Sequence, residues 1–219
     1  YYFIVNPNAR SGKGKSIWRK VCRVMNEKGL VYEALFTEKK GQAAKLARET
    51  AERAAGEKVG EAVIVAMGGD GTISEVMDGI WDHPEVTFAF IPIGSGNDFA
   101  RSLGISSNWR RALDGILSEK HRIYFHPGRL EYDGKVRHFG GSMGIGFDAA
   151  VCDGANRLRF KSAFNRLSLG KFTYTGVAIK LLVTSSCDKL KIRLDGKEIH
   201  KFQKVLFLCG LKGNYEGGG

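Results

Sequence analysis

The stretch AVIVAMGGDGTISEV, residues 62–76, decides the fold that this sequence predicts. It begins with an unbroken apolar run typical of a buried strand, turns at Gly68 and Gly69, and enters a helix with Asp70 and Thr72 at its start. Backbone N–H groups and the Thr72 hydroxyl suit phosphate oxygens there, and Asp70 suits Mg²⁺ or the positioning of reacting groups. An ordinary helix N-cap at Asp70 or Thr72 is the competing interpretation.

The segments on either side of this stretch alternate in the same way. The apolar runs and the helical patterns between them are 1–5, 15–28, 31–37, 41–55, 62–67, 72–81 and 87–93. Strands separated by helices indicate βαβ units and a mostly parallel sheet, so we expect an α/β domain. Active sites of such sheets lie at the carboxyl ends of the strands, where the loops VNPNARSG, FTEKKG, MGGDGT and IPIGSGND follow.

A second glycine-containing strand end, IPIGSGNDFARSLGI at residues 91–105, repeats the pattern of the first. Ser95, Asn97 and Asp98 are short polar residues that can reach a ligand from the same sheet edge as Asp70. Helix capping explains any one of them, but three such residues on a loop parallel to the first favour a binding function.

The loop ARSGKGKS, residues 9–16, is close to a nucleotide-binding P-loop without matching it. The pattern G-x-x-x-x-G-K-[ST] requires a glycine where this chain has Ala9. Gly12 and Gly14 still place N–H groups at a helix N-terminus beside two lysines, which suits a phosphate. A basic, solvated loop is the simpler interpretation.

The composition allows a sizeable core and points to an anionic partner. The chain has 219 residues, is 43% apolar and has a formal net charge of +11. This charge favours a nucleotide, an anionic membrane or nucleic acid, the last least because no RNP-type motif, zinc-finger spacing or basic heptad is found. Four cysteines without a C-x-x-C pair, and no apolar run long enough to span a bilayer, predict a cytoplasmic protein without a transmembrane segment.

After His121 the sequence changes to short strand-like pieces with Asp-Gly turns, which predicts a mainly β second domain. We place the α/β domain at residues 1–123 and the β-rich domain at 124–219, with one helix near Ala163–Leu182. The piece GIGFDA, residues 144–149, fits G-x-G-x-x-A but lacks the preceding strand and the later acidic residue of a dinucleotide site.

The blocks VNPNARSG, GGDGT and PIGSGNDFARSLGI, in this order and spacing, resemble the diacylglycerol kinase catalytic-domain family, in particular its soluble bacterial lipid kinases. GGDGT alone is shared with NAD kinases and is similar to the phosphofructokinase loop, but NAD kinases lack the PIGSGNDFAR block. GSMGIGFDA and YEGGG also look like family landmarks, so the resemblance covers the whole chain. It implies a Rossmann-like three-layer domain, as in phosphofructokinase and NAD kinase, and a mainly β-sandwich domain, truncated here, with ATP between the two.

The resemblance also implies which residues contact ATP. They are Asn6, Pro7, Asn8, Ala9, Arg10, Thr37, Gly68, Gly69, Asp70, Gly71, Thr72, Ile73, Ser74, Glu75 and Ser95. At the last of these positions the family more often has threonine. Asp70 and Asp98 are implied as catalytic residues that organise Mg²⁺ and the phosphates, with Asp70 as a metal ligand.

The sequence departs from the family pattern in two places. His126 stands where many relatives have aspartate, and a polar turn residue before Pro127 is the competing interpretation. The family's general-base glutamate, in an Asp-Gly-Glu motif, and its structural Mg²⁺ site both follow the glycine run, so we expect them beyond Gly219. The similar residues 195–198 precede that run and have the pattern of a hairpin turn.

We therefore expect an ATP-dependent lipid kinase that phosphorylates a lipid hydroxyl, with diacylglycerol converted to phosphatidic acid as the leading reaction. Sphingoid bases and undecaprenol present a similar hydroxyl. The alternatives are a NAD kinase-like enzyme, a non-catalytic regulator that binds nucleotide and lipid, and a nucleic-acid-binding protein. A lipid kinase would associate peripherally and transiently with an anionic membrane, and a homodimer is compatible with the sequence.

Overall fold

The structure, a computed structural model, describes residues 1–57, 60–118, 122–147, 149–151 and 187–215. It divides into two compact units, Tyr1–Gly141 with the described residues from Lys212 on, and Ser142–Leu211. The domain boundary after residue 123 stays a prediction. The helix predicted near Ala163–Leu182 lies outside the described residues.

The first unit contains the α/β elements and one hairpin. In chain order they are β1 (Tyr2–Val5), α1 (Ala9–Gly12), α2 (Gly14–Glu27), β2 (Glu33–Phe36), α3 (Gln42–Gly56), β3 (Ala62–Gly68), α4 (Asp70–Gly79), β4 (Val86–Pro92), α5 (Asp98–Ser102), α6 (Trp109–Ser118), β5 (Gly128–Tyr132) and β6 (Lys135–Phe139). The described strands of the second unit are β7 (Ser142–Gly146), β8 (Asp188–Leu194), β9 (Glu198–Val205) and β10 (Phe207–Leu211).

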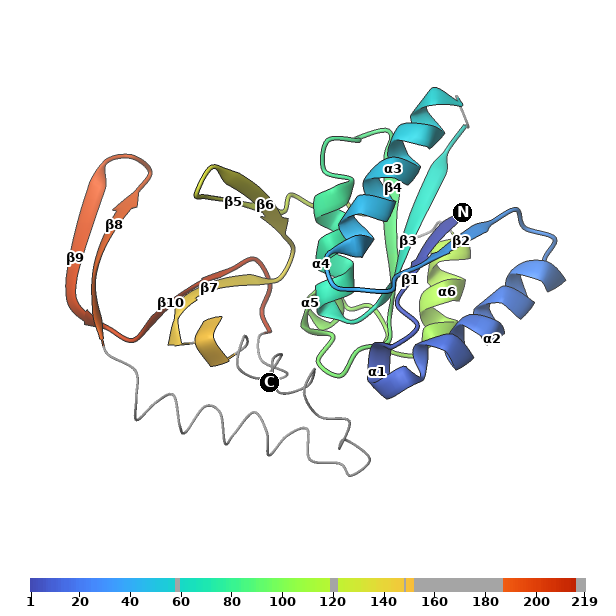
Figure 1. The fold of residues 1–219 in the computed structure, drawn as a ribbon, viewed down its shortest axis with the longest axis horizontal. Coiled ribbons are helices and arrows are strands. Elements are labelled where there is room, and N and C mark those ends of the chain that lie inside the picture. Colours follow the sequence, from blue (N-terminus) through green and yellow to red (C-terminus); the bar gives the residue numbers. More distant parts are fainter. Residues whose placement is uncertain (58–59, 119–121, 148, 152–186, 216–219) are drawn as a thin grey trace. The chain divides into compact units, whose positions relative to one another are not determined.

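A parallel sheet of four strands forms the centre of the first unit, in the order β2-β1-β3-β4. The predicted α/β class and parallel sheet are therefore confirmed. Each strand is followed by a helix, and Figure 1 shows these helices on either side of the strands. Because all four strands run the same way, the loops after β1, β2, β3 and β4 emerge at one edge of the sheet.

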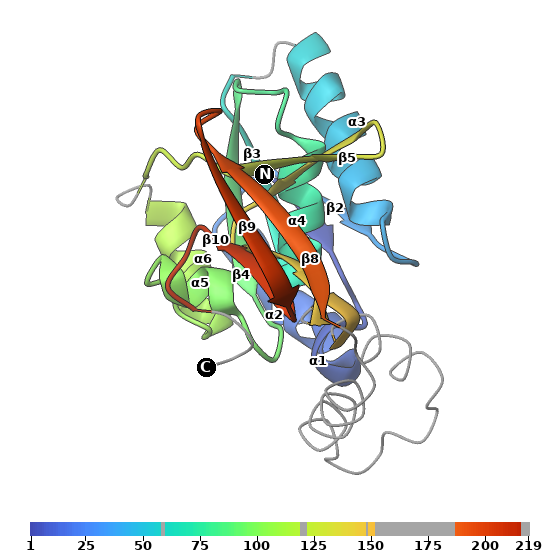
Figure 2. The same ribbon diagram turned by 90° about the vertical axis from the view of Figure 1, so that its left-hand side faces the viewer.

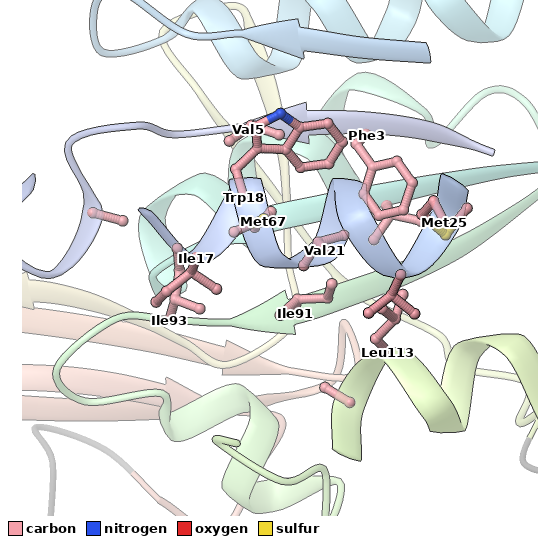
Figure 3. Close-up of a cluster of buried hydrophobic side chains, with 14 residues drawn as sticks. Phe3, Val5, Ile17, Trp18, Val21, Met25, Met67, Ile91, Ile93 and Leu113 are labelled. Carbon is pink, nitrogen blue, oxygen red and sulfur yellow. The ribbon is translucent and has the colours of Figure 1, made fainter. Parts of the chain in front are cut away.

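The face of the sheet that α2 and α6 cover has an aromatic and aliphatic core. Successive strand residues point to opposite faces, so Phe3 and Val5 lie on this side and Ile4 on the other. In Figure 3, the α2 side chains Ile17 and Val21 point toward Ile93 and Ile91. The buried members are Phe3, Val5, Ala9, Ile17, Trp18, Val21, Val24, Met25, Val65, Met67, Ile91, Ile93, Ala112 and Leu113.

The opposite face packs against α3, α4 and α5, and α4 contacts the backbone of α3 at Gly79. Its buried members are Ile4, Ala43, Ala47, Ala51, Ile64, Ala66, Ile73, Val76, Met77, Ile80, Phe90, Phe99 and Ala100. The alanines recur at helical spacing along α3, so this helix presents a flat surface to α4. A Cβ added at Gly79 would lie 3.0 Å from the backbone Cα of Ala44, and only glycine fits this contact without a shift.

The helices differ from the sequence pattern at three places. The short helix α1 occupies Ala9–Gly12, where a loop was expected before the helix at 15–28. The helix expected from residue 72 begins at Asp70, because Gly69 is extended at the N-cap position. Helix α6 was not predicted, although Trp109, Ala112, Leu113 and Ile116 have the spacing of one buried helix face. Asn108 Oδ1 accepts hydrogen bonds from the backbone N–H of Arg110 at 2.9 Å, which is an N-cap signal that the sequence already carried.

The Asp-Gly turns form hairpins as predicted. Asp133 and Asp195 have φ of 48° and 49°, and the following glycines have φ of 68° and 72°, as a two-residue hairpin turn of this kind requires. These turns join β5 to β6 and β8 to β9, and β7 pairs antiparallel with β10. Figure 2 shows the β8–β9 hairpin as a long two-stranded ribbon in orange and red.

An ionic contact fixes the β5–β6 hairpin to α4 within the first unit. Asp78 accepts hydrogen bonds from the backbone N–H of His138 and from Arg137 Nη1, both at 2.7 Å. The carboxylate raises the pKa of the Arg137 guanidinium above its ordinary value, mainly through this hydrogen bond. The His138 ring stacks on Trp81 with ring centres 4.4 Å apart. A carboxylate near a helix C-terminus is unfavourable by itself, so these donors offset its cost.

In the part of the chain that the structure describes, none of the helices combines the length and the apolar character that crossing a bilayer requires.

Two helix glycines, Gly79 and Gly115, predict opposite effects of substitution by alanine. Gly79→Ala forces a Cβ into the α3 backbone and should lower the free energy of unfolding by about 1–3 kcal/mol. Gly115→Ala in α6 meets no atom within 4 Å, so it should raise the free energy of unfolding by about 0.5–1 kcal/mol through helix propensity. Urea unfolding of both variants checks this, and equal effects would contradict the close α3–α4 contact.

Candidate active site at the strand ends

The loops after β3 and β4 touch each other through their backbones. A Cβ added at Gly94 would lie 2.6 Å from the Cα of Gly69, so no side chain fits between the two loops. The N–H of Ile93 donates to the carbonyl of Gly68 at 2.8 Å, which extends the strand pairing up to this contact. The two glycine loops therefore form one continuous surface at the carboxyl edge of the sheet.

The loop after β1 joins this surface through a side-chain hydrogen bond. Asn6 Nδ2 donates to Thr72 Oγ1 at 3.1 Å, and Thr72 is only 8% exposed. The Thr72 side chain lies against Gly68 so closely that a Cβ there would overlap it. Packing against Thr72 therefore requires a glycine at position 68. The Asn6–Thr72 hydrogen bond connects the loop after β1 to the loop after β3, and the Gly69–Gly94 contact connects the loop after β3 to the loop after β4.

Asp70 accepts backbone hydrogen bonds from the beginning of α5. Its Oδ2 accepts from the N–H of Asn97 at 2.8 Å, and its Oδ1 accepts from the N–H of Phe99 at 3.3 Å. Asn97 has a positive φ of 56°, is buried, and closes its own loop by exchanging two side-chain hydrogen bonds with the backbone of Gly94. Backbone donors therefore fix the direction of the Asp70 carboxylate.

Carboxylate oxygens of Asp70 and Asp98 both lie close to Gly96. An added Cβ at this glycine would be 3.3 Å from Asp70 Oδ2 and 3.6 Å from Asp98 Oδ2. Arg101 Nη1 is 3.5 Å from Asp98 Oδ1, and the Asp98 side chain is 19% exposed. Two carboxylates that face one small gap beside a glycine loop can share a cation or orient a phosphorylated ligand.

The N-terminus of α4 supplies the opposite charge at the same edge. The first N–H groups of a helix have no partner within it, and the helix dipole favours an anion there. Gly71 is exposed, and an added Cβ would meet no atom within 4 Å. A phosphate group can therefore reach the backbone at this turn.

The loop after β1 does not form a Walker A loop. Gly14 allows α2 to begin against the loop backbone, since an added Cβ would be 2.8 Å from the carbonyl oxygen of Pro7. The N–H of Lys15 donates to that same carbonyl at 3.2 Å. These groups at the start of α2 are used inside the fold, which agrees with the interpretation that the glycines of ARSGKGKS do not cradle a phosphate.

Glu75 caps a neighbouring helix. Its two carboxylate oxygens accept from the N–H groups of Gly41 at 2.9 Å and of Ala43 at 3.2 Å, at the beginning of α3. Gly41 has a positive φ of 82°, and the backbone N–H of Thr37 continues the pairing of β2 with β1 by donating to Val5. Glu75 therefore holds the loop after β2 in place, and Thr37 lies buried below it.

The remaining predicted residues differ in how they can contact a ligand. Ala9 and Ile73 are buried in the two cores, so only their backbones are available. Asn8, Arg10 and Ser95 are exposed, and Pro7 and Ser74 are partly exposed. His126 lies exposed before β5. The structure thus brings the strand-end residues to one edge, and their contacts with ATP stay a prediction.

Sequence reasoning did not single out two residues that shape this edge. Gly94 and Gly96 set the approach of the two loops and of the two carboxylates. Asn97 was predicted to reach a ligand, and in the structure its side chain folds the second loop. The pair of glycines in IPIGSGND was the available signal, because a strand end with two glycines favours a close backbone approach. The identity of the touching partner, Gly69, depends on the order of the strands.

The comparisons with known proteins agree on one family. The model of the diacylglycerol kinase catalytic domain matches residues 1–124. The diacylglycerol kinases of Staphylococcus aureus (strain bovine RF122 / ET3-1) and Staphylococcus carnosus (strain TM300) are 28% and 26% identical to the chain over 216 residues, 98% of its length. A crystal structure of a diacylglycerol kinase from Bacillus anthracis superposes with a TM-score of 0.65 and 25% identity over 99% of the chain.

The chain spans less than two thirds of each of these relatives. It covers 62% of the Staphylococcus aureus protein, 64% of the Staphylococcus carnosus protein and 65% of the solved Bacillus anthracis chain.

Two buried threonines offer a test of the link between the site loops. Thr72→Val removes the acceptor of the Asn6 side chain and should lower the free energy of unfolding by about 1 kcal/mol. Thr50→Val is the control, because the Thr50 hydroxyl only donates to the helix carbonyl of Leu46. Its effect should stay within about 0.5 kcal/mol. Equal losses in urea unfolding would mean that the Asn6–Thr72 hydrogen bond does not join the loops.

Proposed function

The chain belongs to the diacylglycerol kinase catalytic-domain family, and we propose that the protein transfers the γ-phosphoryl group of ATP to the hydroxyl group of a lipid. The proposed acceptor is diacylglycerol, and the product is phosphatidic acid. The relatives are named diacylglycerol kinases, which supports this choice of acceptor.

One observation carries the proposal most directly. Two glycine loops meet at the carboxyl edge of the parallel sheet, with the α4 N-terminus on one side and the carboxylates of Asp70 and Asp98 around Gly96. All of these residues lie in the part that the family model matches. We propose that the phosphates of ATP lie along Gly69–Thr72 and that residues after β1 and β2 line the rest of the nucleotide site.

The carboxylates around Gly96 fit the requirements of Mg²⁺. This ion binds hard oxygen ligands, uses one or two carboxylates, and fills its remaining positions with water and phosphate oxygens. Asp98 and the free lone pairs of Asp70 are suitable, since each Asp70 oxygen accepts one backbone N–H. When bound, the ion neutralises charge that develops on the phosphates.

The protein residues then have positioning and electrostatic roles. In the transfer, a bond forms between the acceptor oxygen and the γ-phosphorus, and the bond to the oxygen that leaves with ADP breaks. The hydroxyl proton passes to a carboxylate base, which we place in the Asp-Gly-Glu motif expected beyond Gly219. The N–H groups at the beginning of α4 stabilise negative charge on the phosphates.

We also propose that the protein docks peripherally on anionic membranes, where a lipid acceptor would be found. The chain has a formal net charge of +11. On one face of the β8–β9 hairpin, Lys191 pairs with Lys201 and Arg193 pairs with Ile199, and these basic side chains are exposed. Each cation near an anionic surface contributes about 1 kcal/mol.

Transfer of labelled γ-phosphate tests the kinase proposal. The full-length protein with Mg²⁺ is offered diacylglycerol, sphingosine, undecaprenol and NAD in turn. We expect label on diacylglycerol, and a loss of at least about 100-fold in kcat for Asp98→Asn, because an electrostatic contact to the transferred group is removed.

Asp114→Asn is the matched control, since this aspartate forms an exposed pair with Arg110 in α6. It should keep the wild-type rate. Label on NAD in place of any lipid would overturn the acceptor class. Absence of label on all acceptors, together with measurable ATP binding, would favour a nucleotide-binding regulator.

Vesicle sedimentation tests the docking proposal. Binding to phosphatidylglycerol vesicles should exceed binding to phosphatidylcholine vesicles and should fall as salt is added, because the attraction is screened. Lys191→Gln with Lys201→Gln should weaken binding by about 2 kcal/mol. The control Lys45→Gln with Arg48→Gln removes the same charge from exposed positions of α3. Equal weakening by both pairs would exclude the hairpin as the docking face.

A further inference from the structure

The chain segment that follows β10 packs against α5. The N–H of Lys212 donates to the carbonyl of Gly141 at 2.8 Å. Gly213 passes so close to α5 that an added Cβ would be 2.8 Å from the Cβ of Ser102. The Ser102 hydroxyl in turn donates to the backbone carbonyl of Asp98 at 2.9 Å. The segment thus contacts the helix that begins with one of the two site carboxylates.

Tyr215 lies at the end of this contact and stacks on Arg101. The guanidinium carbon of Arg101 is 4.2 Å from the centre of the Tyr215 ring, which is the distance of a cation–π contact. The same guanidinium places Nη1 3.5 Å from Asp98 Oδ1. An arginine can do both at once because its planar group stacks through its face and interacts with a carboxylate through its edge.

We propose that Arg101 and Tyr215 are positioning residues that hold the Asp98 carboxylate toward Gly96 and Asp70. The proposal rests on the proposed function, in which Asp98 organises Mg²⁺ and the phosphates of ATP. Nothing in it requires Arg101 or Tyr215 to touch the ligand.

The physical reason is the difference between the two carboxylates. Asp70 is oriented by two backbone N–H groups, whereas Asp98 has the long, flexible side chain of Arg101 beside its carboxylate. An arginine loses much rotamer freedom when it is held in one geometry, so an isolated surface pair of this kind contributes little. Stacking on Tyr215 limits that freedom in advance, which keeps Arg101 beside Asp98 at a smaller entropic cost.

The arrangement also links distant parts of the sequence. Tyr215 follows β10 directly in the chain, and Asp98 follows the β4 loop. A change that detaches the Lys212–Tyr215 segment from α5 would therefore loosen Asp98 without altering any residue of the glycine loops.

Substitutions in the full-length protein test the pair. Tyr215→Leu removes the stacking ring and should raise two quantities about two- to fivefold: the Mg²⁺ concentration for half-maximal activity, and the Kd for a non-hydrolysable ATP analogue with Mg²⁺. Tyr215→Phe keeps the ring and should behave as wild type. Arg101→Met should raise both quantities by about tenfold, because charge and stacking are both lost. The double variant should be no worse than Arg101→Met alone.

Arg110→Met is the matched control, because Arg110 forms a similarly exposed pair with Asp114 away from the site. A thermal melt of each variant separates loosening of Asp98 from unfolding, and the melting temperature should change little. The proposed positioning role would be refuted if the effects of Tyr215→Leu and Arg101→Met on the Kd were fully additive in the double variant. It would also be refuted if Tyr215→Leu had the wild-type dependence of activity on Mg²⁺ concentration.

The two proposals fail in distinguishable ways. If the wild type phosphorylates no acceptor while Tyr215→Leu still weakens binding of the ATP analogue with Mg²⁺, the lipid kinase function is wrong and the positioning pair stands. If the wild type phosphorylates a lipid and both pair variants match it, the pair is wrong and the function stands.

Discussion

The contact between the backbones of Gly69 and Gly94 is the constraint on which the candidate site depends. Because no side chain fits between the loops after β3 and β4, the two strand ends approach as closely as the strand pairing itself allows. This approach brings the beginning of α5 within reach of Asp70, whose carboxylate then accepts the N–H groups of Asn97 and Phe99. A larger residue at Gly94 would push the loops apart and weaken those hydrogen bonds.

The two cores explain why this contact is rigid. Alternating strand residues are buried on both faces of the sheet, between α2 and α6 on one side and α3, α4 and α5 on the other. Neither strand can slide without exposing apolar side chains, since a shift by one residue exchanges the faces. The packing of β3 and β4 therefore fixes the position of the glycine loops. The hydrogen bond from Asn6 to Thr72 holds the loop after β1 beside them.

The sequence predicted the parts of the structure that depend on local chemistry. Apolar runs, helical periodicity and Asp-Gly turns depend only on residues that are close in sequence, and the corresponding strands, helices and hairpins are present. The helix α6 was missed although its spacing is local. The roles of Glu75 and Ala9 could not be predicted from their sequence neighbours. Glu75 caps α3 from α4, and Ala9 is buried in a core that β1, α2, β3, β4 and α6 also line. Such roles appear only when the order of the strands is known.

The two site carboxylates differ in whether their positions could be predicted from nearby sequence. Asp70 is fixed by the glycine loops, which lie near it in sequence or on the next strand, so its place follows from the motif and the parallel sheet. Asp98 stands beside Arg101, and Arg101 is ordered by a ring from the segment after β10. The geometry of the pair around Gly96 therefore depends on the glycine loops through Asp70 and on the segment after β10 through Arg101 and Asp98. In the proposed kinase, the C-terminal segment would therefore act on the site through Arg101 and Asp98, while Asp70 depends on the glycine loops.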